Sequence, residues 1–276
     1  MSRLLAIPFI CALLLSGSSQ NGTAAGASPA AGALVAKYEL TLAGVSFGEF
    51  HLTAVIRGSR YHLQAKAEFS ILRGLVYRGG GQTRSAGKLT KTGPEPLIFE
   101  VSYAGGDKKE KRRMAFSNGA VSQYSIVPAK RPNPRRVPLT EDQLKDVLDP
   151  LSAAFLAVQS DLPPGNIGIC DGTAHVFDGQ QRFDITLRPK RTDTFLRSAP
   201  SNLSGPVAVC RVKFVPIGGY RPDNPGIKFM TETDDVEAWL TPVPNTRLYL
   251  PYRIIVPTPL GPGSATLTEV KMRPLQ

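Results

Sequence analysis

Nine basic residues lie between positions 107 and 136, where the only acidic residues are Asp107 and Glu110. The basic residues are Lys108, Lys109, Lys111, Arg112, Arg113, Lys130, Arg131, Arg135 and Arg136. The segment therefore carries most of the net charge of the chain, which is +11 in total. Such a cluster can bind phosphate or carboxylate groups on nucleic acids, lipid surfaces or acidic polymers. The alternative is a solvated hairpin edge, on which lysine and arginine prevent edge-to-edge pairing.

Residues for catalysis or metal binding do not form a recognisable motif. The chain has no G-x-S-x-G, no H-E-x-x-H and no S-x-x-K with its companion sequences. Its histidines, His51, His62 and His175, are scattered and it has no C-x-x-C pair, so we expect no metal site and no cofactor. Asp234 and Asp235 would point to opposite faces of a strand. Carboxylates that converge in space for glycoside cleavage stay open as an alternative.

The N-terminus has the order of a secretory signal peptide, with Arg3, an apolar run at 4–15 and then small residues. Ala25-Gly26-Ala27 is the expected cleavage signal, so residues 1–27 are predicted to be removed. The apolar run is shorter than the roughly 20 residues that span a membrane, and a retained anchor is the alternative. Export argues against nucleic acid as a partner. It favours envelope lipids or anionic polymers, with peripheral membrane contact.

Cys170 and Cys210 are the cysteines that would remain after cleavage, because Cys11 lies in the apolar run. In an exported chain an isolated pair usually forms a disulfide, and we predict one here. It would close a loop of about 40 residues and stabilise the fold by roughly 3–4 kcal/mol on a chain-entropy argument. Two separate buried thiols are the alternative.

Apolar and polar residues alternate over most of the chain from Val35 onwards, which predicts β-strands with one buried face. Inward positions of the first strands, with two residues of a helical segment, form the candidate lining of an apolar cavity. They are Tyr38, Leu40, Phe50, Leu52, Tyr61, Leu63, Leu151 and Phe155. The alternative is that the same residues fill a packed core.

The segment from Thr140 to Val158 interrupts the alternation, because its apolar residues have helical spacing. Pro150 would break a single helix, so we predict two short helices, at about 141–148 and 150–158. Asp149 is the expected N-cap of the second helix, with the proline at its first position.

Together these patterns predict an all-β fold with a small helical insertion at 140–158. The strands should form a strongly curled antiparallel sheet, as an open or a closed barrel. A linker is predicted at 28–34 and a single barrel-like domain at 35–272. The glycines at 79–81 are interpreted as a bend of the sheet, and residues 217–232 as a long loop rich in turns.

Several short motifs in the second half resemble one exported bacterial family. They are DPLS at 149–152, VFDG at 176–179, RFD at 182–184, AWLT at 238–241 and RLYLP at 247–251, with the strand of Cys210 between them. On these motifs the chain resembles the family called domain of unknown function 3108, over about 35–272. The basic block at 108–136 has no counterpart in the family pattern.

The resemblance implies a periplasmic protein of a Gram-negative bacterium. The curled sheet and helical plug are similar to those of carriers of outer-membrane lipoproteins. We therefore expect a non-enzymatic cell-envelope protein that binds an apolar or anionic component, which is a lipid, a lipoprotein or a cell-wall polymer. A structural or interaction protein with a filled core, and a hydrolase acting on envelope polymers, are the alternatives. The oligomeric state is not predicted.

Overall fold

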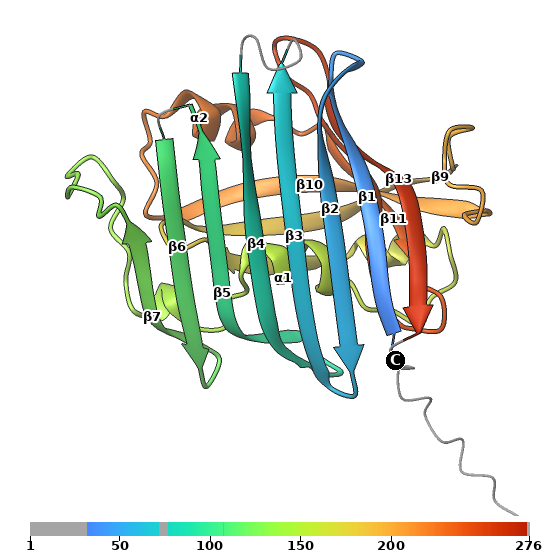
Figure 1. Ribbon diagram of the computed structural model, residues 1–276, viewed down its shortest axis with the longest axis horizontal. Coiled ribbons are helices and arrows are strands. Elements are labelled where there is room, and N and C mark those ends of the chain that lie inside the picture. The colour runs from blue at the N-terminus through green and yellow to red at the C-terminus, as the bar shows by residue number, and fades with distance from the viewer. Residues whose placement is uncertain (1–31, 72–76, 107, 275–276) are drawn as a thin grey trace, which may run out of the picture.

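The computed structural model describes residues 32–71, 77–106 and 108–274. These residues form one antiparallel sheet of 13 strands, together with short helical segments. The sheet curls strongly but stays open, because the strands at its two ends do not pair along their length (Figure 1). The predicted fold class is confirmed, with the barrel in its open form. The predicted signal peptide, residues 1–27, lies outside the described residues.

The first half of the sheet is a meander of strands joined by short turns. Its strands are β1 (Gly32–Leu42), β2 (Val45–Arg57), β3 (Arg60–Ile71), β4 (Tyr77–Leu89), β5 (Pro94–Gly105), β6 (Lys108–Ser117) and β7 (Ala120–Val127). Because β1 begins at Gly32, the end of the linker predicted at 28–34 already belongs to the sheet. In β3, Tyr61, Leu63 and Ala65 are buried and the residues between them are exposed, as alternation requires.

The second half is another meander that returns to the first. A 3₁₀ helix at Ile167–Cys170 precedes β8 (Gly172–Phe177), β9 (Arg182–Thr194), β10 (Pro206–Gly218), β11 (Val236–Pro242), β12 (Tyr249–Val256) and β13 (Gly263–Pro274). β13 pairs with β1, where Tyr38 lies opposite Leu267. The sheet therefore runs from β7 to β1 and then from β13 to β8. In Figure 1 the second meander crosses behind the first.

The glycines of β4 mark a place where the strands approach each other closely. A Cβ on Gly80 would lie 2.6 Å from the carbonyl oxygen of Ala67 on β3. A Cβ on Gly81 would lie 2.7 Å from the carbonyl oxygen of Ser102 on β5. Side chains do not tolerate such distances, so the curl at this position requires glycine. The interpretation of this run as a bend is consistent with these contacts.

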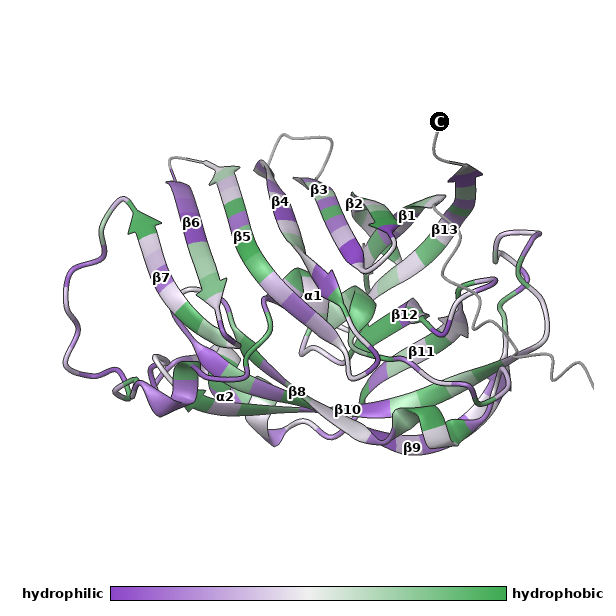
Figure 2. Ribbon diagram, turned by 90° about the horizontal axis from the view of Figure 1, so that it is seen from below, coloured by the Kyte–Doolittle hydropathy of each residue, from purple (hydrophilic) through white to green (hydrophobic). Residues whose placement is uncertain are grey.

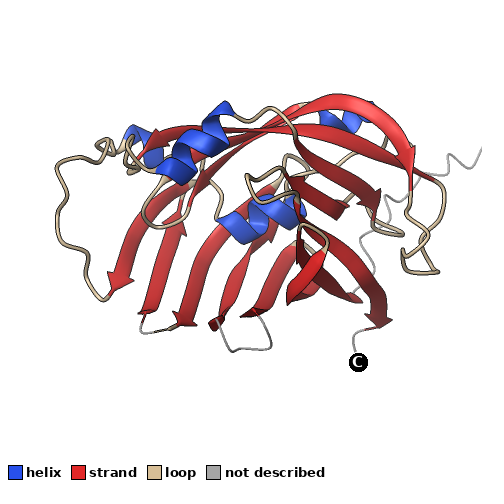
Figure 3. Ribbon diagram, turned by 90° about the horizontal axis from the view of Figure 1, so that it is seen from above, coloured by secondary structure: helices blue, strands red, loops and turns tan. Residues whose placement is uncertain are grey.

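The chain between β7 and β8 crosses the open side of the sheet and carries α1 (Pro150–Leu156) into the concavity (Figures 2 and 3). Lys145 forms a bridge with Ala120 of β7. Leu148 forms another with Val176 of β8. This short stretch therefore joins the two edges of the sheet at one point.

The first of the two predicted helices is reduced to a 3₁₀ turn at Asp142–Leu144. Asp146 has a positive φ of 51°, which ends helical geometry. Its N–H donates to the carbonyl of Gly119 at 2.7 Å. The N–H of Leu148 donates to the carbonyl of His175, also at 2.7 Å. Pairing with the two sheet edges thus overrides the local helical spacing.

The second predicted helix is confirmed as α1, which ends at Leu156, slightly before its predicted end. A further helix, α2 (Pro225–Glu232), lies within the stretch 217–232 that was predicted as a loop. It begins as α1 does, with a capping side chain, here Asn224, directly before a proline. The same start signal that identified α1 could therefore have identified α2.

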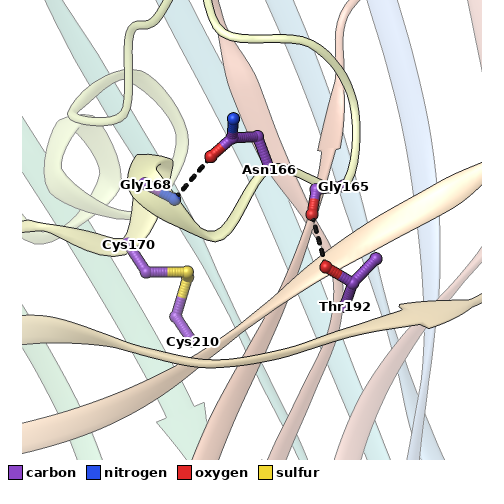
Figure 4. Close-up of a disulfide and its surroundings, with 6 residues drawn as sticks. All are labelled: Gly165, Asn166, Gly168, Cys170, Thr192 and Cys210. Carbon is purple, nitrogen blue, oxygen red and sulfur yellow. Dashed lines mark hydrogen bonds between the residues drawn. A yellow bond between two sulfur atoms is a disulfide. The ribbon is translucent and has the colours of Figure 1, made fainter.

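The predicted disulfide between Cys170 and Cys210 is present. Both cysteines are fully buried, in a small core separate from the main core that contains the residues of α1. Figure 4 shows the bridge and a neighbouring contact, in which the hydroxyl of Thr192 donates to the carbonyl of Gly165 at 2.8 Å. The chain that leaves the concavity is thereby tied to β10.

Replacing both cysteines with serine should lower the free energy of unfolding by roughly 4 kcal/mol, because the disulfide spans 40 residues. Urea denaturation of the oxidised protein and of the Cys170→Ser/Cys210→Ser variant measures the difference. Reducing the unsubstituted protein should produce a similar loss. Free thiols at both positions in the oxidised protein, detected by alkylation and mass spectrometry, would contradict the pairing.

Candidate functional site

The carboxylate of Asp149 is the fixed point of the concave face, and its side chain is completely buried. One carboxylate oxygen accepts the N–H groups of Leu151 and Ser152, each at 3.0 Å, which caps α1. The other oxygen accepts the hydroxyls of Ser152 and Ser85, each at 2.7 Å. Because Ser85 belongs to β4, the cap of the helix also binds the helix to the sheet.

Tyr61 of β3 completes what we call the anchor cluster, which consists of Tyr61, Ser85, Asp149 and Ser152. The Tyr61 hydroxyl lies 2.8 Å from that of Ser152, which lies 2.9 Å from that of Ser85. Burial raises the pKa of the Asp149 carboxyl and of the Tyr61 phenol. Four hydrogen-bond donors, rather than a cation, satisfy the buried carboxylate. The cluster therefore fixes the depth at which α1 lies in the sheet.

On one side of α1 the concave face is filled. Phe155 stacks on Phe50, with ring centroids 5.8 Å apart and planes 7° apart. Its ring also meets that of Tyr38 edge-on at 6.1 Å. Leu52 and Leu156 are buried in the same core. The space left there is about 40 Å³, which is far below the size of ligand cavities.

On the other side of α1 the concave face is open. We call this space the hollow, a cavity of about 940 Å³ between the helix and strands β2, β4, β5 and β6. Its apolar and aromatic lining consists of Phe50, Phe99, Val101, Tyr103, Pro128, Pro150, Leu151, Ala154 and Phe155. The hollow adjoins a second cavity of about 1040 Å³ beside the glycines 79–81. These volumes are in the range of sites for large ligands.

A cluster of charged side chains lies at the edge of the hollow. Arg112 bonds to Glu110 at 2.6 Å and to Asp178 at 2.8 Å, and Lys130 bonds to the second oxygen of Glu110. Partial burial opposes ionisation of Glu110, but these hydrogen bonds outweigh it and lower the pKa of its carboxyl. Two cations and two carboxylates thus neutralise one another in what we call the ion-pair cluster.

Lys108 and Lys109 also line the hollow, and both are exposed. Neither forms an ion pair with any part of the chain that the structure describes. Since the ion-pair cluster is neutral as a whole, these two lysines give the edge of the hollow its net positive charge. An apolar cavity with a positive edge fits a ligand with an apolar body and an anionic group.

The structure divides the eight residues predicted to line a cavity. Phe50, Leu151 and Phe155 line the hollow. Tyr38, Leu52, Tyr61 and Leu63 are buried in the main core. Leu40 is partly exposed and lines neither half of the concavity. Four of the eight residues thus belong to the packed core, which was the alternative, where α1 covers the inner face of the sheet.

The nine basic residues do not form one patch. Arg112 and Lys130 belong to the ion-pair cluster, and Arg113 pairs with Glu100 at 3.1 Å. Arg135 pairs with Asp223 at 3.1 Å, near the start of α2. Arg136 donates a hydrogen bond to the carbonyl of Gly219. No ion pair with a described residue is formed by the other four, Lys108, Lys109, Lys111 and Arg131.

Sequence reasoning missed Thr83, Phe99, Val101, Tyr103 and Ala154 as lining residues. Three of them alternate along β5, so their shared face could be predicted from the sequence. The sequence could not predict that these three residues face a cavity, because that depends on how far α1 extends over the inner face. The remaining two are small or polar, and nothing in their local pattern distinguishes them.

Metal binding finds no support in the described ranges, where no three His, Cys, Asp or Glu side chains gather closely enough to hold an ion. Among the helices of those ranges, none has the length and apolar character needed to cross a membrane.

Comparison with known proteins gives a family and a fold. The family model described as "Protein of unknown function (DUF3108)" matches residues 37–268. No curated protein matches significantly. A crystal structure of a beta-barrel-like protein of the domain of unknown function DUF1849 from Brucella abortus is similar, with a TM-score of 0.51 and 8% identity. The similarity covers 89% of this chain and 99% of that one, and it supports the curled-sheet fold.

Replacing Asp149 with alanine should lower the free energy of unfolding by roughly 2–4 kcal/mol, because it removes the cap of α1 and leaves buried hydroxyls without their acceptor. Urea denaturation measures the loss. Asp142→Ala is the matched control, since the side chain of Asp142 is 87% exposed and should change stability by less than about 0.5 kcal/mol. Equal effects of the two substitutions would show that the anchor cluster does not fix the helix.

Proposed function

Since the chain belongs to the DUF3108 family, whose name assigns no activity, we propose its function from the hollow: it binds the acyl chain of an anionic amphiphile. Fatty acids, phospholipids and the acyl groups of lipoproteins belong to this ligand class. We further propose that it acts as a non-enzymatic protein of the periplasm. The observation that carries the proposal is a large cavity with an apolar wall and a positively charged edge.

The shape of the apolar wall supports an acyl chain. Phe155 and Leu151 of α1 form one side of the hollow, and Phe99 and Val101 of β5 form another. Phe99 and Leu151 are already buried, but Phe155 and Val101 are only partly buried and expose apolar surface to the hollow. Burying them against a ligand would contribute about 25 cal/mol for each Å² of apolar surface removed from water.

The charge at the edge supports an anionic head group. Lys108 and Lys109 can approach a carboxylate or phosphate without breaking the ion pairs of Arg112. An anion at this position would be partly screened by solvent, so its contribution should be modest and dependent on salt.

The acidic and hydroxyl groups of the concavity support binding rather than hydrolysis. Glu110 has a lowered pKa, whereas a general acid for glycoside cleavage needs a raised one. The pKa of Asp149 is raised, but its carboxyl is completely buried and all its hydrogen bonds are to the chain itself. Ser85 and Ser152 are almost completely buried within the anchor cluster, which separates them from any substrate in the hollow. The disulfide supports an oxidising compartment, in agreement with a periplasmic location.

Filling the hollow should abolish binding of a long-chain acyl probe. We expect 11-(dansylamino)undecanoic acid to bind the delipidated protein saturably, with increased and blue-shifted fluorescence. Ala154→Trp places a large ring in the hollow from an exposed position on α1 and should reduce the affinity at least about tenfold, at unchanged stability.

The matched control is Ala115→Trp, because Ala115 alternates with Met114 and Phe116 and so lies on the outer face of β6. It should bind the probe normally. No saturable binding to the unsubstituted protein, or equal binding to both variants, would overturn the proposal and favour a structural role for the concave face.

Removing the two lysines at the edge should weaken anionic ligands selectively. Lys108→Ser/Lys109→Ser should reduce the affinity for a fatty acid about three- to tenfold and flatten its salt dependence, while a fatty alcohol binds unchanged. Competition with the dansyl probe measures both ligands. The control is Lys88→Ser/Lys91→Ser, which removes the same charge at the C-terminal end of β4, away from the end of the sheet where Lys108 lies. A uniform loss for acid and alcohol would contradict a role for charge.

A further inference from the structure

The edge strand β7 presents an open backbone. It pairs with β6 along its length, and among the described residues its only other β-bridge is that from Ala120 to Lys145. The rest of the strand, Val121–Val127, faces no other strand. An open edge offers a row of N–H and C=O groups to which an extended chain can add as a further strand.

Beyond a bulge in its pairing with β6 at Ala115 and Phe116, this edge has little of the protection that sheets usually place on an edge strand. β7 has the sequence AVSQYSIV, without a charged residue or a proline. Tyr124 and Val127 are 50% and 59% exposed. Five of the nine basic residues lie on β6, one strand further in, and the other four follow β7 in the chain. They therefore flank the edge without blocking it.

The two faces of β7 differ in character. Tyr124 lies opposite Met114, and Ile126 lies opposite Arg112, so both point to the inner face. The Tyr124 ring touches the buried ring of Phe177, with centroids 5.3 Å apart. An added strand would meet apolar side chains on this face.

On the outer face, the residues of β7 itself are uncharged, and the residues opposite them on β6 are cationic. Ser125 lies opposite Arg113, and Val127 lies opposite Lys111. A strand added to β7 would lie about 9.5 Å from β6, which is two strand spacings. Lys111 forms no ion pair among the described residues, so its long side chain can extend towards an acidic side chain on the added strand. Arg113 is paired with Glu100 of β5 and would have to leave this partner to do the same.

We propose that β7 is a docking edge for an extended segment of a partner protein in which acidic and apolar residues alternate. The acidic side chains would lie on the outer face beside Lys111 and Arg113, and the apolar ones would pack on Tyr124 and Ile126. This inference does not depend on the proposed ligand of the hollow.

The same charges argue against a second copy of this chain as the partner. Pairing two β7 edges would place two cationic outer faces side by side, on chains that each carry a net charge of +11. Like charges at this range oppose association, whereas an acidic segment gains attraction from the same groups.

A synthetic peptide tests the docking edge directly. The probe is a fluorescein-labelled, acetylated peptide of about eight residues in which Glu and Val alternate. We expect saturable binding to the full chain by fluorescence anisotropy, weaker at higher salt. A Lys/Val peptide should bind at least about tenfold more weakly. A Glu/Val peptide with N-methyl groups on alternate amides should also lose affinity about tenfold, because it cannot form the ladder of hydrogen bonds.

A charge on the edge itself provides the matched pair of variants. Ser125→Glu adds a negative charge beside Arg113 and should weaken the Glu/Val peptide about tenfold while strengthening the Lys/Val peptide. Ser117→Glu makes the same change at the last residue of β6, away from the open stretch, and should leave both affinities unchanged. The far-UV circular dichroism spectrum and the urea denaturation midpoint should be unchanged in both variants, which shows that they fold.

Two results would overturn the proposal. Equal affinities of the N-methylated and unmodified peptides would show that binding is only electrostatic and does not add a strand. Absence of binding by any of the peptides to the folded protein would show that the edge is not a docking site for this class of segment.

Discussion

The buried carboxylate of Asp149 is the interaction on which the arrangement of the concavity depends. It accepts four hydrogen bonds, two from the first turn of α1 and two from hydroxyls, one of which belongs to β4. A short helix has little stability of its own, so its place in the protein must come from such tertiary contacts. Because this cluster fixes the depth of α1, it also decides how much of the inner face the helix covers and how much stays open as the hollow.

The way in which the sheet edges meet gives the concavity two different sides. Residues 145–148 tie the two edges together through the backbone, because Lys145 is bridged to Ala120 of β7 and Leu148 to Val176 of β8. At the hollow, the contact depends on one side chain, because the guanidinium of Arg112 on β6 bonds to the carboxylate and to the backbone carbonyl of Asp178, which follows β8. Side-chain ion pairs can rearrange more readily than a backbone ladder. The two edges of the sheet are therefore held by a rigid backbone contact at residues 145–148 and by a more adaptable ion pair beside the hollow.

Much of the fold could be predicted from local sequence, and the site could not. Alternation in β3 or β5 depends on neighbouring residues, and the cysteine pair needs only its spacing and compartment. The anchor cluster, by contrast, joins Ser85 to Asp149 over 64 positions and Tyr61 to Ser152 over 91. No local pattern encodes such contacts, so the sequence could not distinguish filled from open parts of one apolar face. The loss of the helix around Asp146 has the same origin, because contacts with distant strands determine its backbone.

The neutral ion-pair cluster has a consequence for how a ligand could be oriented. If a head group had to displace Lys130 or Arg112, it would leave Glu110 or Asp178 partly buried without a partner, which is costly. Lys108 and Lys109 can receive an anion without this cost. Lys108 lies roughly 20 Å along β6 from Met114, since a strand rises about 3.4 Å per residue. A head group at Lys108 would thus allow an extended acyl chain to run past Arg112 towards Phe99 and α1, where the apolar wall of the hollow begins.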